Sequence, residues 1–227
     1  MKVFAIGDLH LPGGEDKPMD VFGGHWDGHF DRIRDAWEQS VGEEDVVLLP
    51  GDTSWAMKLD AAMGDLDAIA ALKGTKIITR GNHDYWWTSL SKLRARLHKS
   101  MVALQNDSHV IGGVCFAGSR GWACPGSTGF GAHDQAIYER ELARTRLSLQ
   151  SAPDGVPIIA ALHFPPVNER HQPSGFTELF REFKVKTVVY GHLHGRACKN
   201  AFEGLRDGVE YHLCSSDYLG FKPKRIL

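Results

Sequence analysis

The hydrophobic positions along the chain fall into two patterns that alternate from the N-terminus. Short, mainly apolar runs of strand length occur at 2–7, 46–50, 76–80, 156–162 and 186–190. Such runs, bounded by polar or turn residues, predict strands that are buried on both faces. Between them apolar residues recur at helical spacing, and we predict helices over 29–41, 58–72, 88–98, 133–150 and 175–183.

The segment 101–118 departs from this alternation. Its short apolar runs are separated by Asn106-Asp107 and Gly112-Gly113, which are turn-forming pairs. We therefore expect antiparallel strands with hairpin turns there, and one or two final strands within 208–227. Strands alternating with helices predict an α/β fold in which two packed mixed β-sheets are flanked by helices, in a single domain over 1–227.

Composition and charge narrow the class of protein. The formal net charge of −2 does not favour nucleic acid as a partner. No apolar run approaches the roughly 20 residues of a membrane span, so we expect no membrane partner, and the start MKVFAIGDLH lacks the long uncharged segment of a secretory signal. The four cysteines form no C-x-x-C pair, so we expect reduced thiols in a cytoplasmic protein.

Side chains that commonly bind metals directly follow five of the predicted strands. They are Asp8, His10, Asp52, Asn82, His163, His192 and His194. Ligands bind at the carboxyl ends of strands in open α/β sheets, so these loops should converge. Carboxylate, imidazole and amide ligands suit manganese, iron or zinc better than an all-oxygen calcium site. Seven ligands exceed what one tetrahedral ion needs and fit two ions that share a carboxylate.

These blocks together resemble the calcineurin-like metallophosphoesterase superfamily. They are Asp8-Leu9-His10, Gly51-Asp52, Gly81-Asn82-His83-Asp84, His163-Phe164-Pro165-Pro166 and Gly191-His192-Leu193-His194, in the family's order. The resemblance implies a sandwich of two sheets between helices and a metal-dependent phosphoester hydrolase. In such an enzyme, a hydroxide that bridges two metal ions attacks the phosphorus of a phosphomonoester or phosphodiester.

The resemblance also assigns roles to the residues. The first metal would be held by Asp8, His10 and His194, the second by Asn82, His163 and His192, with Asp52 bridging both. His83 would assist the leaving group as a general acid or charge stabiliser. Asp84 would orient His83 and favour its protonated form. Manganese is the expected metal, with iron or zinc as alternatives.

Candidate substrate contacts lie outside these blocks. Arg120 follows an apolar strand and Arg170 follows the H-x-P-P block, and arginine is well suited to contact phosphate. An ion pair is the alternative for Arg120. The loop 12–27 directly follows the first block, so His25 or Trp26 could touch substrate. His25 and His29 also have the spacing of a separate zinc site. The alternative to both interpretations is a surface or cap role for this segment.

Two other functions compete with hydrolysis. A binding or scaffold module of the same fold would bind partners without turnover. Such modules arise when metal ligands are lost, and all seven are present here. A single-metal oxygenase site needs two histidines and one carboxylate, which leaves ligands over. Within hydrolysis, a small soluble phosphoester or a nucleotide is the expected substrate, and the oligomeric state is left open.

Overall fold

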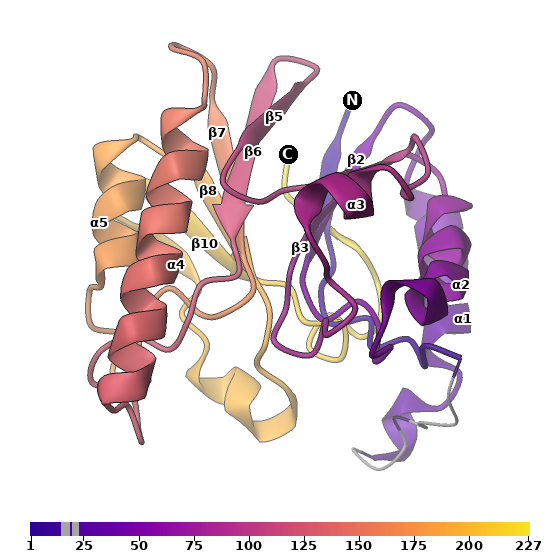
Figure 1. Cartoon of the computed structure of the whole chain (residues 1–227), viewed down its shortest axis with the longest axis horizontal. Helices are drawn as coiled ribbons and strands as arrows, with labels where there is room; N and C mark the ends of the chain where they lie inside the picture. Colours follow the sequence, from indigo (N-terminus) through magenta and orange to yellow (C-terminus); the bar gives the residue numbers. More distant parts are fainter. Residues whose placement is uncertain (15–18, 20–22) are drawn as a thin grey trace.

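Two mixed sheets pack face to face, and helices cover their outer faces (Figure 1). The computed structural model describes residues 1–14, 19 and 23–227. The sheets, the helices and their arrangement confirm the α/β sandwich expected from the sequence.

The first sheet belongs to the N-terminal half of the chain. In spatial order its strands are β11 (Lys224–Arg225), β1 (Val3–Ala5), β2 (Val46–Pro50), β3 (Thr75–Thr79) and β4 (Met101–Ala103). Strands β1 to β4 are parallel, and β11 pairs antiparallel with β1. The helices of this half are α1 (His29–Ser40), α2 (Leu59–Ala70) and α3 (Leu90–Arg94), together with the 3-10 turn η2 (Gly24–Trp26).

The second sheet belongs to the C-terminal half. In spatial order its strands are β5 (Ser108–Ile111), β6 (Val114–Ser119), β7 (Ile158–Leu162), β8 (Thr187–Tyr190), β10 (Val209–Leu213) and β9 (Gly204–Arg206). The four inner strands are parallel, and β5 and β9 form antiparallel edges. The helices are α4 (Ala132–Gln150) and α5 (Gly175–Glu182), with the 3-10 helix η3 (Gly195–Asn200).

The continuous apolar strands are explained by burial on both faces. In β2, Val46 and Leu48 point into the core between the sheets, where they meet residues of the second sheet such as Phe116. Val47 and Leu49 alternate with them and pack in a separate core beneath the helices. Both sets are fully buried, so a strand with no polar positions is what this layer requires.

Most predicted elements are found within a few residues of their expected bounds, with two kinds of difference. Strands β5 and β6 form the expected hairpin, but β4 pairs in parallel with β3 in the first sheet. The expectation of antiparallel pairing was therefore wrong for β4. The elements η2, η3 and β9 were not predicted. They are short, and pattern carries little information over three to six residues.

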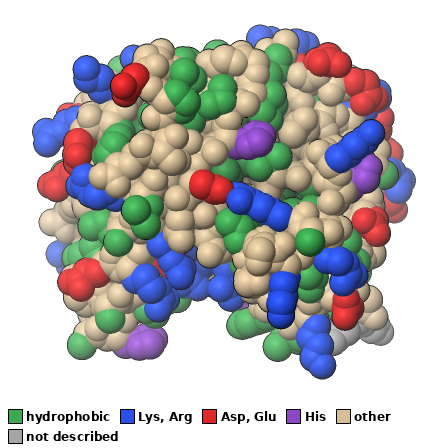
Figure 2. Space-filling view, turned by 45° about the horizontal axis from the view of Figure 1, so that its top comes forward, with side chains coloured by type: hydrophobic (Ala, Val, Ile, Leu, Met, Phe, Trp, Pro, Cys, Tyr) green, Lys and Arg blue, Asp and Glu red, His purple; other side chains and the backbone are tan. Residues whose placement is uncertain are grey.

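The parallel strands of both sheets end at one edge of the sandwich, which places their outgoing loops together (Figure 1). Figure 2 shows charges of both signs scattered over one face, and a hollow at the lower edge between the two halves. None of the helices in the described part of the chain is both long and apolar enough to cross a membrane.

Candidate metal centre

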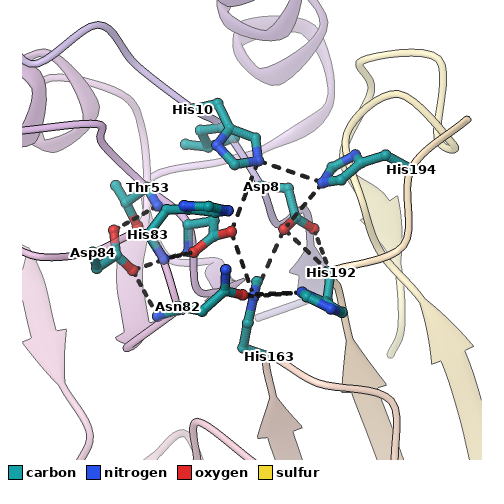
Figure 3. A network of polar contacts seen from close by, with 12 residues as sticks. Asp8, His10, Thr53, Asn82, His83, Asp84, His163, His192 and His194 are labelled. Carbon is teal, nitrogen blue, oxygen red and sulfur yellow. Dashed lines mark hydrogen bonds and ion pairs between the residues drawn. The ribbon is translucent and has the colours of Figure 1, made fainter. Parts of the chain in front are cut away.

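The structure brings all seven predicted ligand residues into one cluster at this edge (Figure 3). Asp8 and His10 lie after β1, Asp52 after β2, Asn82 after β3, His163 after β7, and His192 and His194 after β8. Each half of the sandwich thus contributes, and the cluster spans the two sheets.

The local backbone of these loops is shaped for close approach. Asp8, His10, Asp52 and His192 have positive φ angles of 57°, 46°, 50° and 73°. Non-glycine residues rarely adopt this left-handed conformation, and it gathers at functional sites. Glycines precede several ligands for a steric reason: a Cβ on Gly81 would collide with Asp52, and one on Gly191 would collide with Asp8.

Two overlapping groups of donor atoms make up the cluster. Asp8, His10 and His194 form one group, and their donor atoms lie within 4.8 Å of one another. Asp8, Asp52 and His163 form the other, with the same spacing. Asp8 is common to both, and Asp52 lies between them, with its Oδ2 3.4 Å from His163 Nε2 and 3.9 Å from His10 Nε2.

Asn82 and His192 complete the second group. Asn82 Oδ1 lies 2.6 Å from His163 Nε2 and 3.0 Å from His192 Nδ1, and these two nitrogens are 3.2 Å apart. His163 Nδ1 lies 3.0 Å from the Pro50 carbonyl oxygen, a partner that only an N–H can serve. Burial lowers the pKa of His163 and so disfavours a second ring proton; with the proton on Nδ1, the Nε2 lone pair faces the Asn82 oxygen. A cation held by these atoms would satisfy all of them.

The electrostatics of the cluster also call for positive charge. Burial, followed by the charges of Asp84 and Asp8, raises the pKa of Asp52 to about 9. Burial lowers the pKa of His10 and His192 to about 3, which keeps both rings neutral as lone-pair donors. His10 Nδ1 is buried and has no hydrogen-bond partner among the described residues.

His194 holds the positive charge that the metal-free cluster contains. Although burial lowers its pKa, hydrogen bonds to Asp217 and Asp8 raise it to about 10. Burial alone would raise the pKa of Asp8, but the hydrogen bond and charge of His194 bring it below its usual value. A dication would displace the proton that His194 now shares with these carboxylates. The residues therefore fit two divalent cations in type, number and charge.

The expected role of Asp84 differs from its position. Its buried carboxylate accepts hydrogen bonds from the backbone N–H groups of Asp52, Thr53 and Gly81 at 2.7–2.9 Å, and from the Trp86 indole at 2.9 Å. No bond to the His83 ring occurs among the described contacts. The pKa of His83 is lowered, mainly by burial, instead of raised by Asp84. Asp84 thus holds the loop that carries Asp52, because its carboxylate supplies the acceptors that the buried backbone N–H groups of this loop need.

His83 is placed by aromatic contacts. Its ring lies 4.5 Å from the Trp55 ring and 6.0 Å from the His10 ring, centroid to centroid. Its backbone N–H donates to Asp52 Oδ1 at 2.8 Å. The ring is half-buried and borders the cluster without joining either donor group. Trp86 and Trp87, which follow closely in the chain, are buried core residues.

The side chains of Arg120 and Arg170, the two candidate phosphate contacts, make no contact with the ligand cluster among the described interactions. The Arg120 guanidinium lies 3.4 Å from Glu141 on α4 and stacks on Trp122 at 4.6 Å, which favours the ion-pair alternative. The Arg120 carbonyl accepts from the backbone N–H of His163, so its backbone supports the cluster. Arg170 is exposed, and its backbone N–H donates to Asn168 Oδ1 at 3.0 Å.

The described part of loop 12–27 supports the cluster from beneath. Trp26 is 2% exposed, so it packs behind ligands instead of facing substrate: its ring lies 6.1 Å from His10 and 5.8 Å from His194. His29 Nε2 and Nδ1 lie 2.8 and 3.1 Å from the carbonyls of Leu9 and Trp26, which is a structural role. His25 is exposed. Residues 15–18 and 20–22 of this loop lie outside the described residues.

Two residues of the site were missed from the sequence because they lie in the C-terminal tail, after the last motif. Asp217 accepts from His194 Nδ1 at 2.9 Å and from the backbone N–H of Gly195 at 2.9 Å. Ser216 Oγ donates to the Asp8 carbonyl at 2.8 Å. An isolated Ser-Asp pair gives no pattern signal. The one available indication was general: a histidine that binds a metal usually donates its other ring N–H to a carboxylate, so an acidic partner for His194 was to be expected somewhere in the chain.

Comparison with known proteins agrees with this geometry. The family model for calcineurin-like phosphoesterase matches residues 1–196. No curated protein matches the sequence. The structure resembles the phosphopantetheinyl hydrolase of Mycobacterium tuberculosis (TM-score 0.59, 16% identity, 100% of this chain and 95% of the other). It also resembles the protein AQ665 of Aquifex aeolicus, whose function is unknown (TM-score 0.51, 15% identity, 99% and 95% coverage).

Proposed function

The chain belongs to the calcineurin-like phosphoesterase family, and from this premise we propose that it hydrolyses a phosphoester at a pair of divalent cations. One observation carries the proposal: loops from both sheets bring carboxylates, imidazoles and an amide oxygen into two overlapping donor groups. Lone pairs face one another there at hydrogen-bond distance, an arrangement that a cation stabilises.

The donor groups suggest how the cations would be held. Asp8, His10 and His194 would bind the first, and Asn82, His163 and His192 the second, with Asp52 between them. Manganese is the proposed metal, with iron or zinc as alternatives. When bound, the cations would lower the pKa of water toward neutrality and offset the charge of the phosphoryl oxygens.

The protein's own side chains would orient and assist. His83 borders the cluster on the Trp55 side with a half-buried ring, which suits it to donate a hydrogen bond or a proton to a departing alcohol. Asp84 would act indirectly, because its bonds to the backbone of Asp52 and Gly81 set the position of two ligand loops. Asp217 would hold the His194 ring in a fixed tautomer.

The substrate we propose is a small phosphoester or a nucleotide in the cytoplasm, without nucleic acid or membrane as partner. The neighbour named as a phosphopantetheinyl hydrolase adds a phosphopantetheinyl ester to the candidates. The experiment is a panel of phosphomonoesters and phosphodiesters assayed with protein loaded with manganese, iron or zinc. Turnover that depends on metal and disappears on chelation supports hydrolysis.

Two variants separate the roles of the cluster residues. Asp52→Asn should lose both metal content and turnover, because the residue contacts both donor groups. His83→Gln should keep its metal and lose about 10²–10⁴-fold in turnover. Equal losses of metal in both variants would contradict these assignments. Metal-replete protein that is inert across the panel would favour a binding or scaffold module instead.

A further inference from the structure

A cavity of about 250 Å³ adjoins the ligand cluster in the second half of the sandwich. The two share a wall, because His192 lines the cavity as well as the cluster. Phe164 also lines it and packs against the His192 ring with 4.1 Å between centroids. A group bound in this cavity would therefore lie next to the cluster.

The lining is mainly apolar inside and polar at the edge; the buried polar exception is Asn168, whose side-chain NH2 already donates to Pro125 and Gln172. Phe164, Val167 and Cys124 are 7%, 5% and 2% exposed and form the buried part. Exposed Thr128 and Glu169 are among the residues at the edge. Apart from His192, Glu169 is the only ionisable side chain other than a thiol among the lining residues, so the cavity offers no cation to a second anionic group. An uncharged, mainly apolar group is the chemical match.

The cavity and His83 lie on different sides of the cluster. Figure 3 shows His83 on the side of the first sheet, apart from His192. The His83 ring packs on Trp55, whereas the His192 ring packs on Phe164. If an alcohol departs beside His83, the group in the cavity is a second alcohol that stays on phosphorus. Two organic groups on one phosphorus make a phosphodiester.

Building on the proposed function, we propose that this cavity binds the retained alcohol of a phosphodiester, and that this alcohol is uncharged and mainly apolar. In the reaction the oxygen of water bonds to phosphorus and the P–O bond facing His83 breaks. The released alcohol takes the proton, and the phosphomonoester of the retained alcohol is the product. The volume lies just under the roughly 300–1,000 Å³ of sites for whole drug-sized ligands, so it suits one arm of the ester.

The test is a series of p-nitrophenyl alkyl phosphates with methyl, ethyl, propyl and butyl arms, assayed on manganese-loaded protein by release of p-nitrophenolate. Each buried methylene should raise kcat/KM by about fourfold. We expect the butyl ester to exceed the methyl ester at least tenfold. A terminal carboxylate on the arm should remove the gain, since it would enter an apolar cavity beside Glu169.

A variant that fills the cavity gives the decisive comparison. Ala197 is exposed on η3 and lines the cavity, so Ala197→Phe should fold and occupy the space. The butyl-to-methyl ratio should then fall toward one. The matched control is Ala61→Phe, an exposed alanine on α2 in the other half, which should leave the ratio unchanged. A flat series in the unmodified protein, or a ratio that Ala197→Phe does not alter, would overturn the proposal.

Binding decides the case in which no ester is hydrolysed. Monomethyl esters of methyl- and butylphosphonic acid resist hydrolysis, and calorimetry on manganese-loaded protein measures their affinities. Absence of turnover would reject the proposed function. The cavity proposal would still stand if the butyl compound bound at least tenfold more tightly and Ala197→Phe removed the difference, and it would fail if the two affinities were equal.

Discussion

Replacing Asp217 by asparagine should weaken metal binding although Asp217 belongs to neither donor group. One carboxylate oxygen accepts from His194 Nδ1 and the other from the Gly195 N–H, each at 2.9 Å. Asparagine has one oxygen and one NH2 group. In either orientation of the amide, the NH2 group faces one of the two N–H donors, and that hydrogen bond is lost. The His194 ring then loses either its partner or the anchor of the loop that carries it.

The magnitude follows from the role of such carboxylates. Losing the partner of a metal-binding imidazole typically costs 10–100-fold in metal affinity, or about 1.4–2.7 kcal/mol. The lost hydrogen bond to a charged group should also lower the free energy of unfolding by about 1.5–3 kcal/mol. Manganese affinity is measured by competition with a fluorescent chelator, and stability by urea unfolding of the metal-free protein.

A matched control separates the two effects. Asp45 also accepts two backbone N–H groups, those of Lys2 and Gly42, with one bond to each oxygen. It precedes β2, at the opposite end from the ligand loops. Asp45→Asn should lose similar stability and keep its manganese affinity. If Asp217→Asn binds manganese within threefold of the unmodified protein, or if Asp45→Asn loses as much affinity, the reasoning is refuted.

Three further changes test other parts of the structure. Asp84→Asn should lower the free energy of unfolding by about 3–6 kcal/mol, because at least two backbone N–H groups would face the NH2 of the new amide. Urea unfolding of the metal-free variant measures this change. A loss below about 1 kcal/mol would speak against it. In the metal-free protein, Asp52 keeps its proton to about pH 9 and His194 to about pH 10, whereas the unfolded chain releases them near 3.8 and 6.5. The contribution of Asp52 is therefore lost between about pH 4 and 9, and that of His194 between about pH 6.5 and 10, by ~1.4 kcal/mol per pH unit for each retained proton. Below about pH 6.5 the lowered pKa values of His10 and His192 act in the opposite direction, so the net fall should appear above about pH 7 in unfolding titrations of chelated protein; a flat profile there would contradict the burial of these protons. Manganese at 100 times its Kd should add about 2.7 kcal/mol and raise the Tm by about 5–10 °C, and no shift in a thermal scan would argue against a cation site.

The sequence determined the layers of the fold and the polar residues that converge at one edge of the sheets. Strands such as 46–50 carry no polar position, and only burial on both faces explains this. The ligand residues stand directly after such strands, so parallel pairing suffices to bring Asp8, Asp52 and Asn82 together. These inferences succeed because they depend on local periodicity and on the common direction of parallel strands.

Only the tertiary structure decided which partners surround those ligands. The sequence position of Asp84, next to His83, suggested a bond between them, yet its carboxylate turns to the backbone of Asp52. Asp217 reaches His194 across 23 positions of the chain, and no repeating pattern links the two. The cavity beside His192 likewise forms from segments that meet only in space. Hydrogen-bond partners and cavities depend on side-chain directions after packing, and periodicity along a chain carries no record of them.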